Sequence, residues 1–255
     1  MTNPWTTTDT AALAKALVAA RAAGQRLATA DLAIPPDLAA AFAVQTEIAT
    51  LRGASVGGWK VGIGPGATPI AAPLDPPRDV GLGAVTIPWR KKIGIEVEFA
   101  VRLATDIRAR PQQPWTRSEL LATIDSVLLG VEITGGRLAD GNAAPFTLFV
   151  ADSLDNAAYV LGPDLPRESL DRVADGRVPL TVTGIAPWSG VATHALKDPL
   201  APLLACANAE HFPLGGLRAG QIITTGALCG MLPIARAGVV DILFDQITTM
   251  RFTFT

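Results

Sequence analysis

Two glutamates, Glu96 and Glu98, stand one residue apart in an apolar run that also contains Ile95, Val97 and Phe99. Isoleucine, valine and phenylalanine favour an extended strand, and alternate side chains of a strand lie on the same face. Both carboxylates are therefore predicted to share one face. In apolar surroundings their charges repel each other unless a proton or a cation lies between them. A bound divalent metal ion is the simplest way to keep both ionised, and a solvated strand edge with two exposed glutamates is the alternative interpretation.

A third acid, Glu132, lies in a second apolar, strand-like run. Three carboxylates with no nearby histidine or thiol form a hard oxygen site of the kind that suits Mg²⁺ or Mn²⁺. The two histidines, His194 and His211, and the two cysteines, Cys206 and Cys229, do not have the spacing of a zinc site. We expect the histidines to be surface or structural residues and the thiols to be free and buried.

Lys60 is the second candidate for chemistry, because it lies between Trp59 and Val61 in a segment that otherwise looks buried. One interpretation is a lysine whose stem is buried and whose ammonium reaches water. The other is a lysine held near an anionic substrate, where its pKa is easily shifted. The glycines around Lys60 do not have the spacing of a dinucleotide-binding loop, and the chain has no G-x-S-x-G elbow, so neither a Rossmann domain nor a serine hydrolase is predicted.

The elements that must position these residues form an α+β arrangement. Two helices come first, over residues 8–24, with Thr8 or Asp9 as N-cap, and over residues 37–52. They make up a helical segment, residues 1–56, that we expect to pack on a β-rich catalytic domain of residues 57–255. Within that domain, residues 65–77 are predicted to form a loop and residues 117–129 a helix that leads into a strand at 130–134.

The other predicted elements are shorter, and residues 148–152 and 158–162 are expected to bracket a turn. Strands are predicted at residues 58–64, 86–88, 93–103, 178–183 and 222–225, a helix at 199–209, and a closing β-hairpin at 239–244 and 248–254.

The composition is that of a globular protein: 49% of the 255 residues are hydrophobic and 17% are charged. A net charge of −2 without a basic run argues against a nucleic-acid partner. The apolar segment 11–23 is interrupted by Lys15 and Arg21, unlike a signal peptide, and no stretch approaches the length of a membrane span. We therefore expect a cytoplasmic protein with no membrane partner.

Several motifs follow one another along nearly the full chain. They are Ala43-Val44-Gln45, Gly58-Trp59-Lys60-Val61-Gly62, Ile95-Glu96-Val97-Glu98-Phe99-Ala100, Gly130-Val131-Glu132-Ile133 with Arg137, Ala151-Asp152 running to Val160-Leu161-Gly162, Leu217-Arg218-Ala219-Gly220, and Thr225-Gly226-Ala227-Leu228-Cys229-Gly230-Met231. In this order the chain resembles the 2-keto-4-pentenoate hydratase and 4-oxalocrotonate decarboxylase group of the fumarylacetoacetate hydrolase superfamily. The resemblance implies a mixed β-roll with flanking N-terminal helices, assembled as a homo-oligomer.

Carried over by position, the resemblance implies metal binding by three acids, Glu96, Glu98 and Glu132. It implies that Lys60 and Asp79 move protons and orient the water. Arg137 either anchors a substrate carboxylate or braces a metal-binding glutamate.

The chain departs from the family pattern in two places. Ile63-Gly64-Pro65 stands where a Thr-Ser-Lys type of run is usual, and Ser153 and Asp155 stand where the family tends to have Asn and Ser. Asp155 therefore places a carboxylate beside the predicted substrate position, where it would alter proton transfer and repel an anionic substrate.

The implied activity is a metal-dependent hydratase that adds water to a short 2-hydroxydienoate or 2-keto-alkenoate in aromatic catabolism. A 4-oxalocrotonate-type decarboxylase is the first alternative, because the same metal-held enolate would serve loss of CO₂. A fumarylacetoacetate-type C–C hydrolase, which would need a histidine to activate water, is the second. A catalytically inactive, ligand-binding relative is the third.

Overall fold

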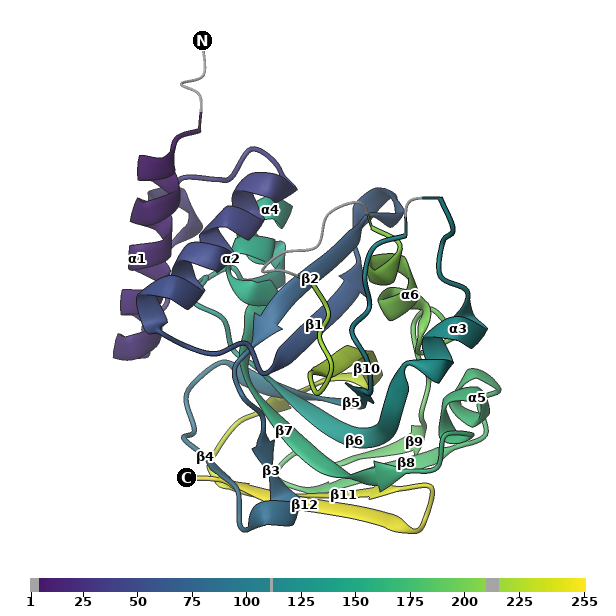
Figure 1. The fold of residues 1–255 in the computed structure, drawn as a ribbon. Coiled ribbons are helices and arrows are strands. Elements are labelled where there is room, and N and C mark those ends of the chain that lie inside the picture. Colours follow the sequence, from purple (N-terminus) through teal and green to yellow (C-terminus); the bar gives the residue numbers. More distant parts are fainter. Residues whose placement is uncertain (1–4, 111, 210–215) are drawn as a thin grey trace.

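Two mixed β-sheets lie one on the other, and helices cover one end of the first sheet (Figure 1). The structure is a computed structural model and describes residues 5–110, 112–209 and 216–255. The seven strands of the first sheet are, in spatial order, β2 (Pro69–Leu74), β1 (Gly58–Ile63), β10 (Ile222–Ile234), β5 (Ile93–Leu103), β6 (Ile124–Thr134), β7 (Asn156–Leu165) and β3 (Arg78–Asp79). The five strands of the second are β4 (Thr86–Ile87), β12 (Thr248–Phe254), β11 (Gly238–Phe244), β8 (Pro179–Gly184) and β9 (Trp188–Val191). The α+β class predicted from the sequence is confirmed.

Six α-helices are present in the described residues. They are α1 (Thr7–Ala23), α2 (Leu38–Arg52), α3 (Arg117–Ala122), α4 (Phe146–Ala151), α5 (Ser169–Ala174) and α6 (Ala201–Ala207). None of the described helices is long and apolar enough to cross a membrane.

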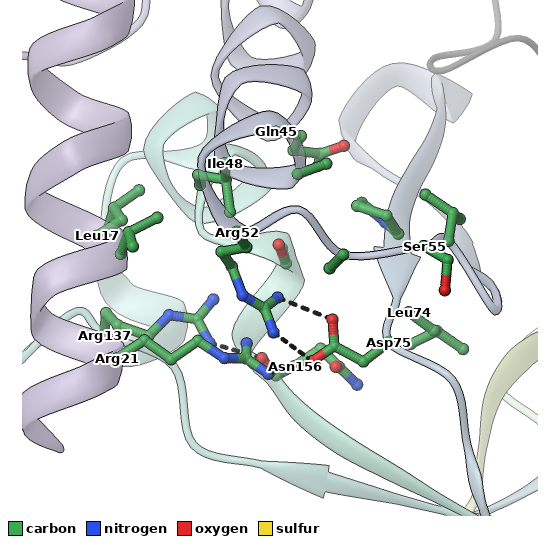
Figure 2. Close-up of a pocket in the computed structure, with 16 residues that line it drawn as sticks. Leu17, Arg21, Gln45, Ile48, Arg52, Ser55, Leu74, Asp75, Arg137 and Asn156 are labelled. Carbon is green, nitrogen blue, oxygen red and sulfur yellow. Dashed lines mark hydrogen bonds and ion pairs between the residues drawn. The ribbon is translucent and has the colours of Figure 1, made fainter.

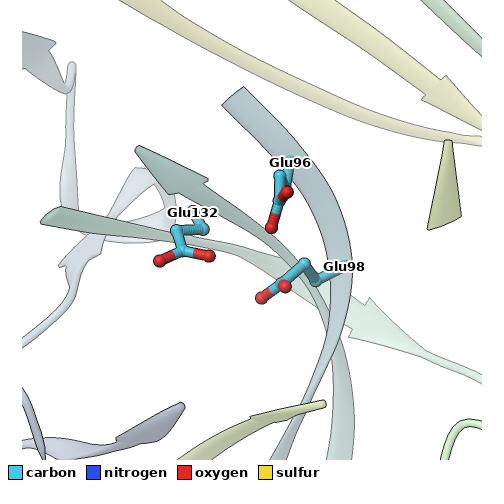
Figure 3. A group of neighbouring side chains, drawn as sticks. All are labelled: Glu96, Glu98 and Glu132. Atoms are coloured by element: carbon cyan, nitrogen blue, oxygen red, sulfur yellow. The ribbon is translucent and has the colours of Figure 1, made fainter. Parts of the chain in front are cut away.

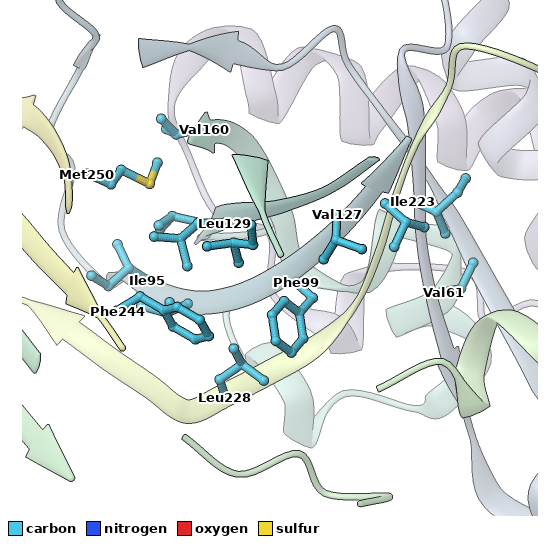
Figure 4. Close-up of a cluster of buried hydrophobic side chains, with 14 of the residues drawn as sticks. Val61, Ile95, Phe99, Val127, Leu129, Val160, Ile223, Leu228, Phe244 and Met250 are labelled. Atoms are coloured by element: carbon cyan, nitrogen blue, oxygen red, sulfur yellow. The ribbon is translucent and has the colours of Figure 1, made fainter. Parts of the chain in front are cut away.

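The main core fills the space between the two sheets. Phe99 on β5 meets Phe244 on β11 edge to face, with 5.7 Å between the ring centroids, and Ile95 packs beside them (Figure 4). Because side chains alternate along a strand, burying Ile95 and Phe99 in this core directs Glu96 and Glu98 to the other face of the sheet. The core therefore fixes the face on which the candidate site is built.

The N-terminal helices begin and end at clear capping signals. Thr6, not Thr8 or Asp9, is the N-cap of α1, and Asp9 completes a capping box with it. Gly24 and Gly53 end α1 and α2 in the left-handed conformation. The apolar faces of both helices pack against β2 and α4 in a second core, built from Leu13, Leu17, Val44, Ile70, Leu148 and their neighbours.

Two predicted elements are wrong in part, although the helix begins at Arg117 with Thr116 as its N-cap, as predicted. The helix expected at 117–129 ends at Ala122, and residues 124–134 form β6. Strand β6 is buried on both faces from Val127 to Thr134, so its apolar run lacks the alternation that identifies a half-exposed strand. The loop expected at 65–77 contains β2, whose prolines are tolerated because β2 is at the edge of its sheet.

Other differences are ones of length or detail. Strand β10 extends to Ile234, far beyond the predicted end at residue 225, and has irregular register between Thr224 and Met231. The expected turn near residue 153 is present, but α4 precedes it. The closing hairpin is confirmed as β11 and β12, joined through Asp245 and Gln246 with positive φ.

Candidate metal centre and active site

The three glutamates predicted to bind metal meet at the middle of the first sheet. Glu96 and Glu132 are direct partners across β5 and β6, and Glu98 lies two residues further along β5, opposite Gly130. One carboxylate oxygen of each lies within 4.8 Å of the others, and the side chains converge in Figure 3. Glu98 and Glu132 are fully buried, whereas the side chain of Glu96 is 21% exposed. The cluster is therefore open to solvent on the side of Glu96.

Burial and mutual repulsion disfavour ionisation of the two inner carboxyls. Burial, and then the charge of Glu132, raises the pKa of Glu98 well above its ordinary value. Burial and the nearby charge of Glu96 likewise raise the pKa of Glu132, although Lys60 opposes this. A divalent cation among the three oxygens would remove this repulsion and favour the ionised forms.

The donor set fits such a cation. The Thr224 hydroxyl donates to Oε2 of Glu98, and the Asn156 amide donates to Oε1 of Glu132 at 2.8 Å. The second oxygen of Glu98, Oε1, is buried and accepts no hydrogen bond from any described residue. A buried carboxylate oxygen without a hydrogen bond costs folding free energy unless a cation binds it. The three carboxylates supply the hard oxygen ligands that Mg²⁺, Mn²⁺ or Ca²⁺ prefer.

Lys60 reaches the cluster from β1. Its ammonium lies 2.6 Å from Oε2 of Glu132 and 4.0 Å from Oε2 of Glu96, and it donates to the Leu154 carbonyl at 3.1 Å. Burial opposes the charge of Lys60, but the three carboxylates outweigh burial and raise its pKa above the ordinary value. Lys60 is thus a buried, charged ammonium beside the carboxylates and not a lysine whose head is in open water.

The turn that holds Lys60 is unusual in its backbone. Ser153, Leu154 and Asp155, three consecutive residues other than glycine, have φ of +57°, +55° and +65°. Each residue in this left-handed region costs of order 1 kcal/mol or more, and such strain gathers at functional sites. Here it directs the Leu154 carbonyl at the Lys60 ammonium.

Arg137 and Asp155 fasten this turn. The Arg137 guanidinium is buried, pairs with Asp152 at 2.5 Å and donates to the Asn156 carbonyl at 2.7 Å. The Asp155 carboxylate accepts from the backbone N–H of Gly136 at 2.6 Å. Arg137 thus contacts the backbone of Asn156, whose side chain donates to Glu132, and its role in bracing a metal-binding glutamate stays a prediction. The predicted contact of Arg137 and Asp155 with substrate stays a prediction.

Sequence reasoning missed Thr224 and Tyr159, which border Glu98. Tyr159 on β7 is paired with Glu132, and its buried hydroxyl lies directly over Gly130, where any side chain would collide with it. Burial, and then the charge of Glu98, raises the pKa of Tyr159 well above its usual value, which keeps the phenol neutral. Tyr159 is the chain's single tyrosine, and Gly130 within an apolar strand was the available signal for a close approach.

Asp79 is not brought to the carboxylates. It lies on β3 in the register row that runs through Leu161 and Gly130 to Glu98. Three strand spacings separate it from Glu98, roughly 14 Å along the sheet. Its carboxylate accepts from the Gly81 N–H at 2.7 Å. The catalytic role predicted for Asp79 stays a prediction.

His194 is a structural residue, one of the two outcomes expected, but it lies nearer the site than its place in the sequence suggested. It is buried beside β10, where Nε2 faces the Thr225 carbonyl at 3.0 Å and Nδ1 accepts from the Leu196 N–H at 3.2 Å. Both ring nitrogens are thus engaged by backbone. Of the thiols, Cys206 is free and buried as expected, whereas Cys229 is partly exposed. His211 lies outside the described residues.

A polar network lies between the helices and this site. Asp75 accepts from Arg52 at 2.8 and 2.7 Å and from Arg21 at 2.8 Å, and Arg137 lies next to Arg21 (Figure 2). The cavity there has about 30 Å³, room for about one water. The network ties α1 and α2 to the end of β2, next to Asn156.

Comparison with known proteins identifies the family. The model of the fumarylacetoacetate hydrolase C-terminal family matches residues 62–255. A 2-keto-4-pentenoate hydratase of Paraburkholderia xenovorans is 32% identical over 162 residues, which are 63% of this chain and 58% of that protein. The TodF product hydratase of Pseudomonas putida is 27% identical over 236 residues, 86% of this chain and 84% of that protein. The first match therefore spans less than two thirds of the relative's length.

Solved structures share the fold. The 4-oxalocrotonate decarboxylase of Pseudomonas putida G7, complexed with magnesium and adipate, superposes with a TM-score of 0.78 over 99% of this chain and 100% of that chain, at 21% identity. The same enzyme complexed with calcium and acetate gives 0.75. The β-roll with N-terminal helices expected from the sequence is confirmed, and the chain belongs to the fumarylacetoacetate hydrolase family.

Proposed function

We propose that the chain is a divalent-metal-dependent hydratase that adds water to a short 2-hydroxydienoate or its 2-keto tautomer. The observation that carries the proposal is the arrangement of Glu96, Glu98 and Glu132 with the Lys60 ammonium in contact. The similarity to proteins named hydratases supports the choice of reaction. Mg²⁺ is the proposed metal, and Mn²⁺ would suit the same oxygens.

The three glutamates would hold the metal, which when bound supplies a Lewis acid for an anionic oxygen of the substrate. Lys60, held as an ammonium, would donate a proton to the substrate carbon chain or a hydrogen bond to the attacking water. The Leu154 carbonyl and Glu132 fix the direction of its ammonium. Asn156 and Thr224 hold the carboxylates of Glu132 and Glu98 in place, so little reorganisation is needed during the reaction.

Product analysis by mass spectrometry tests the proposal. The protein is mixed with 2-hydroxypenta-2,4-dienoate or with 4-oxalocrotonate, each with Mg²⁺ or with a chelator. A metal-dependent product heavier than the first substrate by one water establishes the hydratase. Metal-dependent loss of CO₂ from the second substrate, with no hydration of the first, would replace it with a decarboxylase that uses the same carboxylates.

A C–C hydrolase that relies on histidine receives less support from the site, because both nitrogens of His194 are engaged by backbone groups. Hydrolysis of an acylpyruvate that is lost in the His194→Ala and His211→Ala double variant would revive it. An inactive relative is separated by metal titration with a keto-acid analogue: binding without turnover of any dienoate would reject an enzyme.

A further inference from the structure

A second cavity lies beside the small one, with Arg21 and Arg137 between them, where the end of α1 meets β4, the start of β5 and the exit of β6. Its volume is about 250 Å³. None of its described lining residues is acidic. Six cationic side chains line it: Arg21, Arg26, Arg78, Arg90, Lys91 and Arg137.

Among the residues that the structure describes, carboxylates neutralise only two of these charges. Arg21 pairs with Asp75 and Arg137 with Asp152. Arg26 donates to the carbonyls of Leu138 and Lys92, which carry no net charge, and Arg78 donates to the carbonyl of Thr86.

The other two cations, Arg90 and Lys91, are exposed, and their side chains have no hydrogen bond or ion pair with any described residue. Burial, and then repulsion from Arg137, lowers the pKa of Arg21 to about 10, which is consistent with a positive potential in this region. Four cations without a carboxylate partner among the described residues line one hollow, and although Arg78, Arg90 and Lys91 are exposed to solvent, their combined positive potential would attract an anion.

The cavity is distinct from the carboxylate cluster. Its lining includes neither Lys60 nor any of the three glutamates. Ile133 lines it from the face of β6 opposite to Glu132, and Gly136 lies four residues beyond Glu132, about 13 Å along an extended chain. A short keto acid held at Glu96, Glu98 and Glu132 would therefore not fill it.

The walls suit an organic anion. Guanidinium groups bind carboxylates and phosphates through paired N–H donors, and Ile87, Ile93 and Ile133 offer apolar surface for a carbon skeleton. We propose that this cavity binds a small, multiply charged organic oxyanion, a di- or tricarboxylate or a phosphorylated metabolite, as a second site independent of the metal centre. The inference goes beyond the proposed function and does not rest on it.

Isothermal titration of the metal-free full chain tests the proposal without turnover. The probes are tricarballylate, succinate and glycerol 3-phosphate, each at constant ionic strength, with NaCl as the blank. We expect saturable binding of at least one probe, weakened at least tenfold in the Arg90→Gln and Lys91→Gln double variant. The stronger probe assigns the carboxylate or the phosphate class.

Two controls make the result specific. Lys15→Gln removes an exposed cation of α1 that does not line the cavity and should leave binding unchanged. Glu98→Gln should also leave it unchanged, because the metal centre is not involved. Heat that follows only ionic strength, or equal binding by the double variant, would overturn the proposal. So would a change of oligomeric state in the double variant on size-exclusion chromatography, because Arg90 and Lys91 would then serve a contact between copies.

Discussion

Replacing Glu98 by glutamine should have opposite effects on the metal-free and the metal-bound protein. Oxygens of Glu98 and Glu132 lie within 4.8 Å of each other. Two unit charges at that distance repel by about 3.5 kcal/mol at an effective dielectric constant of about 20. The ammonium of Lys60 offsets part of this, so the metal-free Glu98→Gln protein should be more stable than the wild type by about 1–3 kcal/mol at pH 8. The amide preserves the shape and can still accept from Thr224.

The stability of the metal-free protein should also depend on pH, in a direction that the raised pKa of Glu98 determines. The folded-state pKa of Glu98 is raised, so between the ordinary carboxyl pKa and the raised value the folded protein binds more protons than the unfolded chain. Wild-type stability without metal should therefore fall as the pH rises through this window. The variant lacks this contribution, and its advantage should shrink as the pH is lowered towards 4.5.

Metal binding should respond in the other direction. Losing one of three anionic ligands should weaken Mg²⁺ or Mn²⁺ by at least about a hundredfold, roughly 2.7 kcal/mol. Thermal unfolding at pH 5 and pH 8, with and without metal, and titration calorimetry measure both effects. Glu168→Gln, at an exposed glutamate that does not belong to the carboxylate cluster, is the matched control. A metal-free variant less stable than the wild type at pH 8, or an unchanged metal affinity, would refute the reasoning.

Three further predictions concern the surroundings of the carboxylates. Lys60→Met should lower kcat by about a hundredfold or more while leaving metal affinity within a few fold, measured by steady-state kinetics and calorimetry; an unaltered rate would make Lys60 a structural lysine. Gly130→Ala should lower the Tm by about 4–10 °C, because the new methyl collides with Tyr159, and a second change, Tyr159→Leu, should restore part of the loss. Asp75→Asn should cost about 1–2 kcal/mol at pH 7 after screening, since Arg52 and Arg21 lose their partner. Burial raises the pKa of Asp75, but Arg52 and Arg21 outweigh burial and lower it below the ordinary value. The difference in stability between the wild type and this variant should therefore disappear as the pH falls below about 4. A difference in stability that does not depend on pH would contradict the ion-pair account.

The pairing of Glu96 with Glu98 could be predicted because it depends only on the alternation of one strand. The caps at Gly24 and Gly53 are similarly local. Recognising Glu132 as the third acid needed only a second apolar run with a carboxylate in it.

Contacts between distant strands were beyond local reasoning. Thr224 reaches Glu98 because β10 lies between β1 and β5, an order that neighbouring residues do not encode. The helix predicted at 117–129 was wrong beyond Ala122 for a related reason, because a strand that is covered on both faces has no alternating pattern. The left-handed turn at Leu154 contains no glycine from which it could be predicted, and it is held by tertiary contacts of Arg137 and Asp155.

The backbone strain in that turn sets thermal stability against the catalytic rate. Glycine at position 153 would relieve the backbone without removing an apolar side chain from the core and should raise the unfolding temperature, yet it would also loosen the turn whose Leu154 carbonyl aims the Lys60 ammonium. Selection of variants for heat resistance alone should therefore accumulate changes here, and the most heat-resistant among them should be the slowest. Selection for activity should return serine at this position and, with it, the strained turn.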